Sequence, residues 1–208
     1  MTLGLCSILS FCTRRAEKAD TLRGALGAEP PTLDPYVADT GVSIFVLKQV
    51  QTTLFRLNSY MDVVPGDAES FIWAKNGREL RVTLREGLKW SDGAPLLACH
   101  YRDAFTHVLS PSVAAPLADL FYDIQGAQEF KKGQINPSQF KGVECVDSTR
   151  QIVLQLQHPF SFKIFYALSF VTSSPFRKER FEVLKENWLL GNASYPPIST
   201  GAYFAKEW

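Results

Sequence analysis

The sequence predicts an α+β protein of mixed α/β content, in which helices and hairpins follow one another without the regular strand–helix alternation of a parallel sheet. Three patterns support this fold class. Apolar residues recur at every fourth position from residue 42 and predict a helix at 42–55. Asn76-Gly77, followed by alternating apolar residues at 80–84, predicts a hairpin with a tight type I′ turn. Helical spacing then returns and predicts a second helix at 96–109.

The remaining segments are shorter. A proline-rich stretch at 29–35 predicts a stiff, non-helical loop before the first helix. Residues 89–93 predict a turn in which Trp90 is the structural anchor, with Asp92 and Gly93 completing it. The other expected elements are strands at 21–28, 143–146, 151–156 and from 203 onward, and short helices at 114–122, 124–131, 159–168 and 175–187.

Composition argues for a packed domain and against a nucleic-acid partner. Hydrophobic residues make up 46% and charged residues 21% of the 208 positions, which is ordinary globular usage. The formal net charge is +1, so no overall field attracts nucleic acid. No glycine-rich phosphate loop or nucleophile elbow is present, and the sequence indicates no cofactor.

Four cysteines are present, and none of their spacings is that of a metal site. Cys6 and Cys12 lie near the N-terminus. Cys99 lies in a helix pattern and Cys145 in a strand pattern. We therefore expect Cys99 and Cys145 to be buried thiols rather than a disulfide.

The first twenty residues predict a leader and tether. The apolar run at 3–11 is too short to span a bilayer and has the length of a signal-peptide core, although no positive region precedes it. Leu9-Ser10-Phe11-Cys12 resembles a lipobox, except that Phe11 stands where a small residue is usual. We expect export to the periplasm or cell envelope, with a lipid anchor on Cys12. The alternative is a shortened or inactive leader.

Six segments match one family pattern in order and at matching separations. They are Leu33-Asp34-Pro35, residues 50–54, Ala68-Glu69-Ser70-Phe71, residues 80–93, residues 147–157, and residues 199–203 with Trp208. Together they resemble the family 5 solute-binding proteins of ABC importers. Residues 51–53 and His100-Tyr101 depart from the family pattern.

The resemblance implies a periplasmic-binding-protein-like first lobe with a small subdomain. It places the lobe at about 21–55 and 170–208, and the subdomain at about 56–169. In the family, the segment that matches residues 201–208 lies less than halfway along the chain. We therefore expect an incomplete fold, because closure around a ligand needs two lobes and a hinge. A separate chain could carry the second half of the cleft.

The resemblance also implies a function, namely the substrate-binding component of a peptide importer, which captures oligopeptides and delivers them to a permease. Backbone pairing of an extended ligand would place Thr40, Gly41 and Val42 at the peptide. Leu117 falls where the oligopeptide-binding member has a cleft tyrosine. The simpler alternative is that residues 40–42 are a helix N-terminal loop that binds nothing.

Three other functions remain open from the sequence. The chain could be a truncated remnant that binds nothing, an envelope lipoprotein that contacts another protein, or an enzyme on the same scaffold. His100 and His107 lie two helical turns apart with Asp103 between them, which would permit a metal or acid–base site. A partly exposed helix face is the simpler interpretation.

Overall fold

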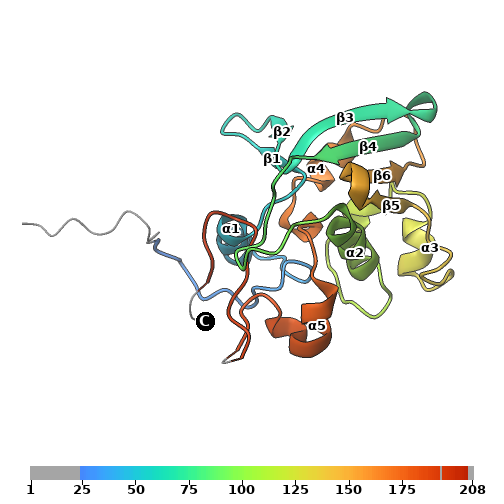
Figure 1. Cartoon of the computed structure of the whole chain (residues 1–208). Coiled ribbons are helices and arrows are strands. Elements are labelled where there is room, and N and C mark those ends of the chain that lie inside the picture. Colours follow the sequence, from blue (N-terminus) through green and yellow to red (C-terminus); the bar gives the residue numbers. More distant parts are fainter. Residues whose placement is uncertain (1–23, 193, 206–208) are drawn as a thin grey trace, which may run out of the picture.

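The computed structural model describes residues 24–192 and 194–205, and a four-stranded antiparallel sheet forms one end of the molecule (Figure 1). The four strands run in the order β3-β4-β6-β5. A separate two-stranded sheet joins β1 and β2. The strands are β1 (Phe55–Leu57), β2 (Val63–Pro65), β3 (Ala68–Ala74), β4 (Glu79–Leu84), β5 (Val143–Val146) and β6 (Gln151–Gln155).

Helices cover one face of the sheet and form the opposite end of the molecule. Figure 1 shows α1 beside the C-terminal segment at that end, and the backbone N–H of Tyr203 donates to the Gln49 carbonyl there, at 3.2 Å. The α-helices are α1 (Gly41–Val50), α2 (Ala98–Val108), α3 (Ala127–Lys131), α4 (Lys163–Ala167) and α5 (Lys178–Leu184). The 3-10 helices are η1 (Lys75–Gly77), η2 (Ala118–Phe121), η3 (Asp147–Thr149), η4 (Val171–Ser173) and η5 (Lys185–Asn187).

The alternation of apolar residues in β4 and β6 determines which face of the sheet is buried. Leu80 pairs with Leu154 and Val82 with Ile152, and all four side chains are fully buried. Opposite residues of an antiparallel pair point to the same face, so these four side chains form one apolar layer. Helix α2 packs on β5 and β6. The hairpin and the helix predicted at 96–109 are thus confirmed as elements.

The first helix is shorter than its sequence pattern. It ends at Val50, and Gln51 is already extended. Beyond this point the backbone N–H of Thr52 donates to the Thr200 hydroxyl oxygen at 2.9 Å. The prediction of a helix to residue 55 was therefore wrong, because pairing with a distant segment takes over from the local helical pattern. The buried side of α1 carries Ser43, Leu47 and Val50.

The connection between β3 and β4 is longer than a two-residue type I′ turn. Ala74 pairs with Glu79, so four residues lie between the strands. Asn76 and Gly77 both have positive φ angles, as the Asn-Gly pair predicted. The wider loop lets the Gly77 carbonyl accept from the Phe160 N–H at 2.8 Å, with the Phe160 ring against Gly77. A side chain at position 77 would clash with this ring.

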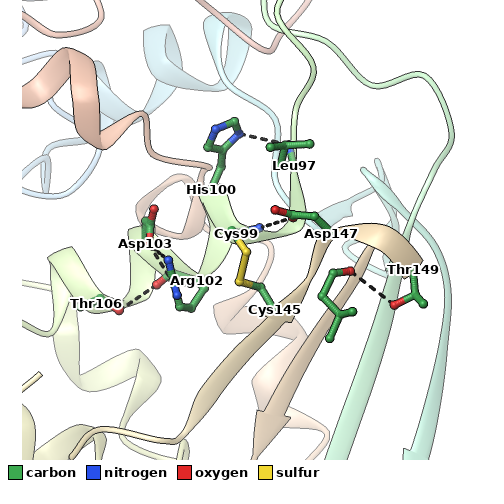
Figure 2. Close-up of a disulfide and its surroundings, with 10 residues drawn as sticks. Leu97, Cys99, His100, Arg102, Asp103, Thr106, Cys145, Asp147 and Thr149 are labelled. Atoms are coloured by element: carbon green, nitrogen blue, oxygen red, sulfur yellow. Dashed lines mark hydrogen bonds and ion pairs between the residues drawn. A yellow bond between two sulfur atoms is a disulfide. The ribbon is translucent and has the colours of Figure 1, made fainter. Parts of the chain in front are cut away.

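The expectation that Cys99 and Cys145 are separate thiols was wrong, because they form a disulfide (Figure 2). Cys145 pairs with the buried Ile152, so its side chain faces α2. Cys99 lies in the first turn of α2, with 5.1 Å between the two Cα atoms. Neither a helical nor a strand pattern reveals this approach, since it depends on how α2 lies on the sheet.

The same turn of α2 is also capped from η3, which follows β5. The N-cap position is occupied by Leu97, whose side chain has no acceptor. Instead, the Asp147 carboxylate accepts from the Cys99 N–H at 3.0 Å, as Figure 2 shows. An acceptor from another element thus satisfies one of the helix's free N–H groups.

Six of the shorter predicted elements differ from the structure. Of the helix predicted at 114–122 only the 3-10 helix η2 forms, and the helix predicted at 124–131 begins only at Ala127. Residues 24–28 and 203–205 form no strand, while 21–23 and 206–208 lie outside the described residues. The helix predicted at 159–168 begins only at Lys163. The helix predicted at 175–187 is divided into α5 and η5. The leader and Cys12 also lie outside the described residues, and the assignment of segments to a lobe and a subdomain stays a prediction.

Candidate functional site

The N-terminus of α1 is positioned by a buried loop. Leu33, Asp34 and Tyr36 are all buried. The Tyr36 hydroxyl donates to the Ser174 carbonyl at 3.0 Å, which ties this loop to the segment after η4. Burial raises the pKa of the Asp34 carboxyl, although the Tyr36 N–H donates to it and opposes that rise. The loop is therefore a fixed support for the residues that follow.

Thr40, Gly41 and Val42 are the first of the predicted ligand contacts, and they lie at the start of α1. The Thr40 hydroxyl oxygen accepts from the Ser43 N–H at 3.3 Å, so Thr40 is the N-cap. Gly41 is exposed, and a Cβ atom built on it would meet nothing within 4 Å. The backbone here is consequently open to an incoming group.

Leu117, the fourth predicted contact, lies on a different part of the fold. It is half-buried and immediately precedes η2. That 3-10 helix packs against α3 and α4, whereas α1 packs against η4. Thr40, Gly41 and Val42 thus lie together at the start of α1, whereas Leu117 lies beside a 3-10 helix that packs on other elements.

A hollow that sequence reasoning missed lies at the other end of α1. Five segments converge there, including the residues after α1 and the segment around Gly201. Gln51 is buried in its wall, and its side-chain Nε2 has no hydrogen-bond partner among the described residues. Asp67 lines it as well and accepts from the Thr52 and Tyr101 hydroxyl groups, each at 2.6 Å. No periodic pattern predicts such a convergence.

The turn at 89–93 is fixed by contacts of its side chains with His100 of α2 and with Arg177. Trp90 is 2% exposed, and its Nε1 donates to the His100 Nδ1 at 3.3 Å. The Arg177 guanidinium lies 5.7 Å from the centre of the Trp90 ring and 2.7 Å from the Asp92 carboxylate. Gly93 has a φ of 87°, which a residue without a side chain adopts readily. The three residues singled out in the sequence therefore lie in one connected turn.

The two histidines of α2 have separate surroundings. The His100 Nδ1 accepts from both Trp90 and the Leu97 N–H, which requires that this nitrogen carries no proton. His107 instead stacks on Phe176, with 4.3 Å between ring centres, and meets Tyr36 edge-on. Among residues 24–192 and 194–205, no group of three or more His, Cys, Asp or Glu side chains could hold a metal ion.

The surroundings of His107 predict a pH-dependent stability. Burial among rings, with a smaller effect of the Lys131 ammonium, lowers the pKa of His107 from 6.5 to about 4. The unfolded chain binds the proton first as the pH falls. The stabilisation is therefore complete above pH 6.5 and is lost between 6.5 and about 4. We expect a loss of ~2 kcal/mol, after allowing for a ring that is partly exposed.

Urea unfolding of the wild type and of His107→Phe, at a series of pH values, tests this expectation. Phenylalanine keeps an aromatic ring in place but cannot titrate. The difference between the free energies of unfolding of the two proteins should change by ~2 kcal/mol between pH 6.5 and about 4. If the free energies of unfolding of the two proteins had the same pH dependence, the assignment to His107 would be contradicted.

Comparison with known sequences identifies relatives over most of the chain. Residues 62–208 match the family described as "Bacterial extracellular solute-binding proteins, family 5 Middle". The dipeptide-binding protein DppE of Bacillus subtilis is 26% identical over 86% of this chain and 32% of its own length. The periplasmic murein peptide-binding protein MppA of Escherichia coli is 30% identical over 92% of this chain and 34% of its own. The chain thus spans about a third of the length of the curated relatives it matches.

Solved structures agree with this relationship. The unliganded open form of MppA superposes with a TM-score of 0.77 and 29% identity, over 88% of this chain and 34% of that one. The Haemophilus influenzae OppA in complex with RPPGFSPFR gives a TM-score of 0.71 and 26% identity, over 78% of this chain and 31% of that one. These neighbours confirm the predicted fold class. The protein is therefore a member of the family 5 bacterial extracellular solute-binding proteins.

Proposed function

We propose that the chain takes part in peptide capture for an ABC-type importer, as a substrate-binding component that passes oligopeptides to a permease. The observation that carries this proposal is the match of both sequence and fold to peptide-binding proteins over most of the chain. The shared region includes the small antiparallel sheet and the buried loop that positions α1. The relatives are named as binding proteins, which favours a binding role for this chain over an enzymatic one.

The peptide would meet the start of α1. Backbone groups of Thr40, Gly41 and Val42 are placed on a fixed support, and Gly41 has open space in front of it. An extended peptide can bind through such backbone groups whatever its side chains are, which suits a receptor for mixed oligopeptides. Leu117, the residue before η2, would contribute an apolar contact in place of an aromatic one.

The location that fits this role is outside the cytoplasm. The Cys99–Cys145 disulfide is typical of proteins that mature in an oxidising compartment. The family is described as extracellular, and a relative at 30% identity is named as periplasmic. In the part of the chain that the structure describes, no helix is both long enough and apolar enough to cross a bilayer. We also propose that a lipid on Cys12 attaches the protein to the membrane, because residues 9–12 resemble a lipobox.

Titration calorimetry with a mixed library of short peptides tests the proposed function. Micromolar binding with measurable heat would support a peptide receptor. No heat at any peptide concentration would contradict the proposal, and would favour the role of an envelope protein that contacts another protein.

Substitution of Gly41 tests the proposed contact. Gly41→Leu places a side chain in the open space without disturbing the packing of α1, because nothing lies within 4 Å. We expect peptide affinity to fall at least about tenfold, with an unchanged melting temperature. Gly27→Leu is the matched control, since Gly27 is also exposed with nothing within 4 Å. Equal affinities of the two variants would exclude the start of α1 as the contact.

A further inference from the structure

The Cys99–Cys145 disulfide lies at the border of the sheet rather than inside the core. Both cysteines are half-buried, and Cys145 belongs to β5, which is a border strand of the four-stranded sheet. A disulfide in such a position is more open to a small thiol in the solvent than one that is fully buried. Its resistance to reduction therefore depends on the groups that surround the two sulfur atoms.

Reduction of the bridge requires a thiolate to form on the protein. The thiolate of a dithiol reductant attacks one cysteine sulfur, the S–S bond breaks, and its electron pair leaves on the other sulfur. The second thiol of the reductant loses its proton to water, attacks the mixed disulfide and releases the first cysteine. The reductant ends as a cyclic disulfide, and the protein ends with two cysteines that take up protons from water. A charge beside the sulfur atoms changes the rate of the first step.

Cys99 occupies a position that ordinarily favours this step. It is the second residue of α2, a helix of 11 residues. The free N–H groups and the dipole at a helix N-terminus stabilise a thiolate. A sulfur that carries negative charge easily is also a good leaving group. From the place of Cys99 in the helix alone, the bridge would be expected to open readily.

The Asp147 carboxylate opposes that effect. Its Oδ1 accepts from the Cys99 N–H at 3.0 Å (Figure 2), so it uses one of the helix donors and places a negative charge beside the cysteine. Among the described residues, no lysine or arginine forms an ion pair with Asp147. Arg102, one turn further along α2, is paired with Asp103 at 2.6 Å. The charge of Asp147 therefore repels both an incoming thiolate and the thiolate that would leave.

We propose that Asp147 protects the Cys99–Cys145 disulfide against thiol reductants while it caps α2. The two roles depend on different properties of one side chain. The cap needs an oxygen that accepts a hydrogen bond, whereas the protection needs the negative charge. The bridge that attaches α2 to β5 thus stays closed when small thiols are present. This protection is independent of the proposed peptide capture.

Timed reduction of the folded 208-residue protein by dithiothreitol tests the proposal. Samples at neutral pH are quenched with a maleimide, and peptide mass spectrometry follows the labelling of Cys99 and Cys145. Asparagine keeps the acceptor oxygen but carries no charge, so Asp147→Asn should be reduced at least about threefold faster than the wild type. High salt should diminish the difference, because Asp147 is exposed and its charge is screened.

The matched control is Glu144→Gln. Glu144 is exposed and immediately precedes Cys145, but it pairs with Val153, so its side chain points to the face of the sheet away from α2. This variant should be reduced at the wild-type rate, and thermal melting should show that both variants are folded at the temperature used. Any of three results would overturn the proposal: a wild-type rate for Asp147→Asn, an equal acceleration by Glu144→Gln, or an acceleration by Asp147→Asn that salt leaves unchanged.

Discussion

Trp90→Ala is expected to lower the free energy of unfolding by about 3–5 kcal/mol. The indole is 2% exposed and meets Trp188 edge-on, with 6.3 Å between ring centres. Its removal would leave a cavity at the point where the turn, α2 and the segment around Arg177 meet. It would also leave the His100 Nδ1 with one donor instead of two. The loss is a large fraction of the stability of a typical domain.

Chemical denaturation of Trp90→Ala and Trp90→Phe measures this effect. Phenylalanine keeps much of the apolar volume but not the indole N–H, so its loss should be clearly smaller. The comparison separates packing from the hydrogen bond to His100. An unchanged melting temperature for Trp90→Ala would show that the turn does not depend on this side chain.

Removing the disulfide is expected to lower the free energy of unfolding by about as much as Trp90→Ala does. The bridge closes a loop between residues separated by 46 positions. The chain-entropy relation gives a stabilisation of about 4 kcal/mol for a loop of this length, through restriction of the unfolded chain. Cys99→Ser/Cys145→Ser should therefore melt at a lower temperature than the oxidised protein.

Reduction by dithiothreitol provides the internal control. The reductant should lower the stability of the wild type towards that of the double serine variant and should leave the variant unchanged. The Asp147 cap on the Cys99 N–H remains available in both forms. Equal stabilities of the oxidised wild type and the variant would contradict a stabilising role for the bridge.

Local patterns in the sequence predicted the elements whose structure depends on local chemistry. The strands β4 and β6 follow the alternation of their apolar residues, and α2 follows its helical spacing. The positive φ angles of Asn76 and Gly77 follow from the residue types themselves. The start of α1 is exposed at Gly41, and the ligand contact that the family resemblance implies there stays a prediction.

Features that depend on distant segments could not be predicted in this way. Helix α1 ends early because the carbonyl of its last residue, Val50, accepts from the N–H groups of Thr200 and Gly201, and the Thr52 N–H donates to the Thr200 hydroxyl, some 150 positions away. The disulfide depends on the side of β5 that faces α2, and the register of β5 on β6 decides this. The hollow beside Gln51 is formed by five segments. None of these contacts between distant segments leaves a periodic pattern in the sequence.

In the proposed complex, a peptide binds the backbone at the start of α1. Hydrogen exchange, followed by NMR with and without a saturating short peptide, tests it at single residues. We expect slower exchange at the amides of Gly41 and Val42, together with little change in β3 to β6. Unchanged exchange at these two amides under conditions where peptide is bound would contradict the claim.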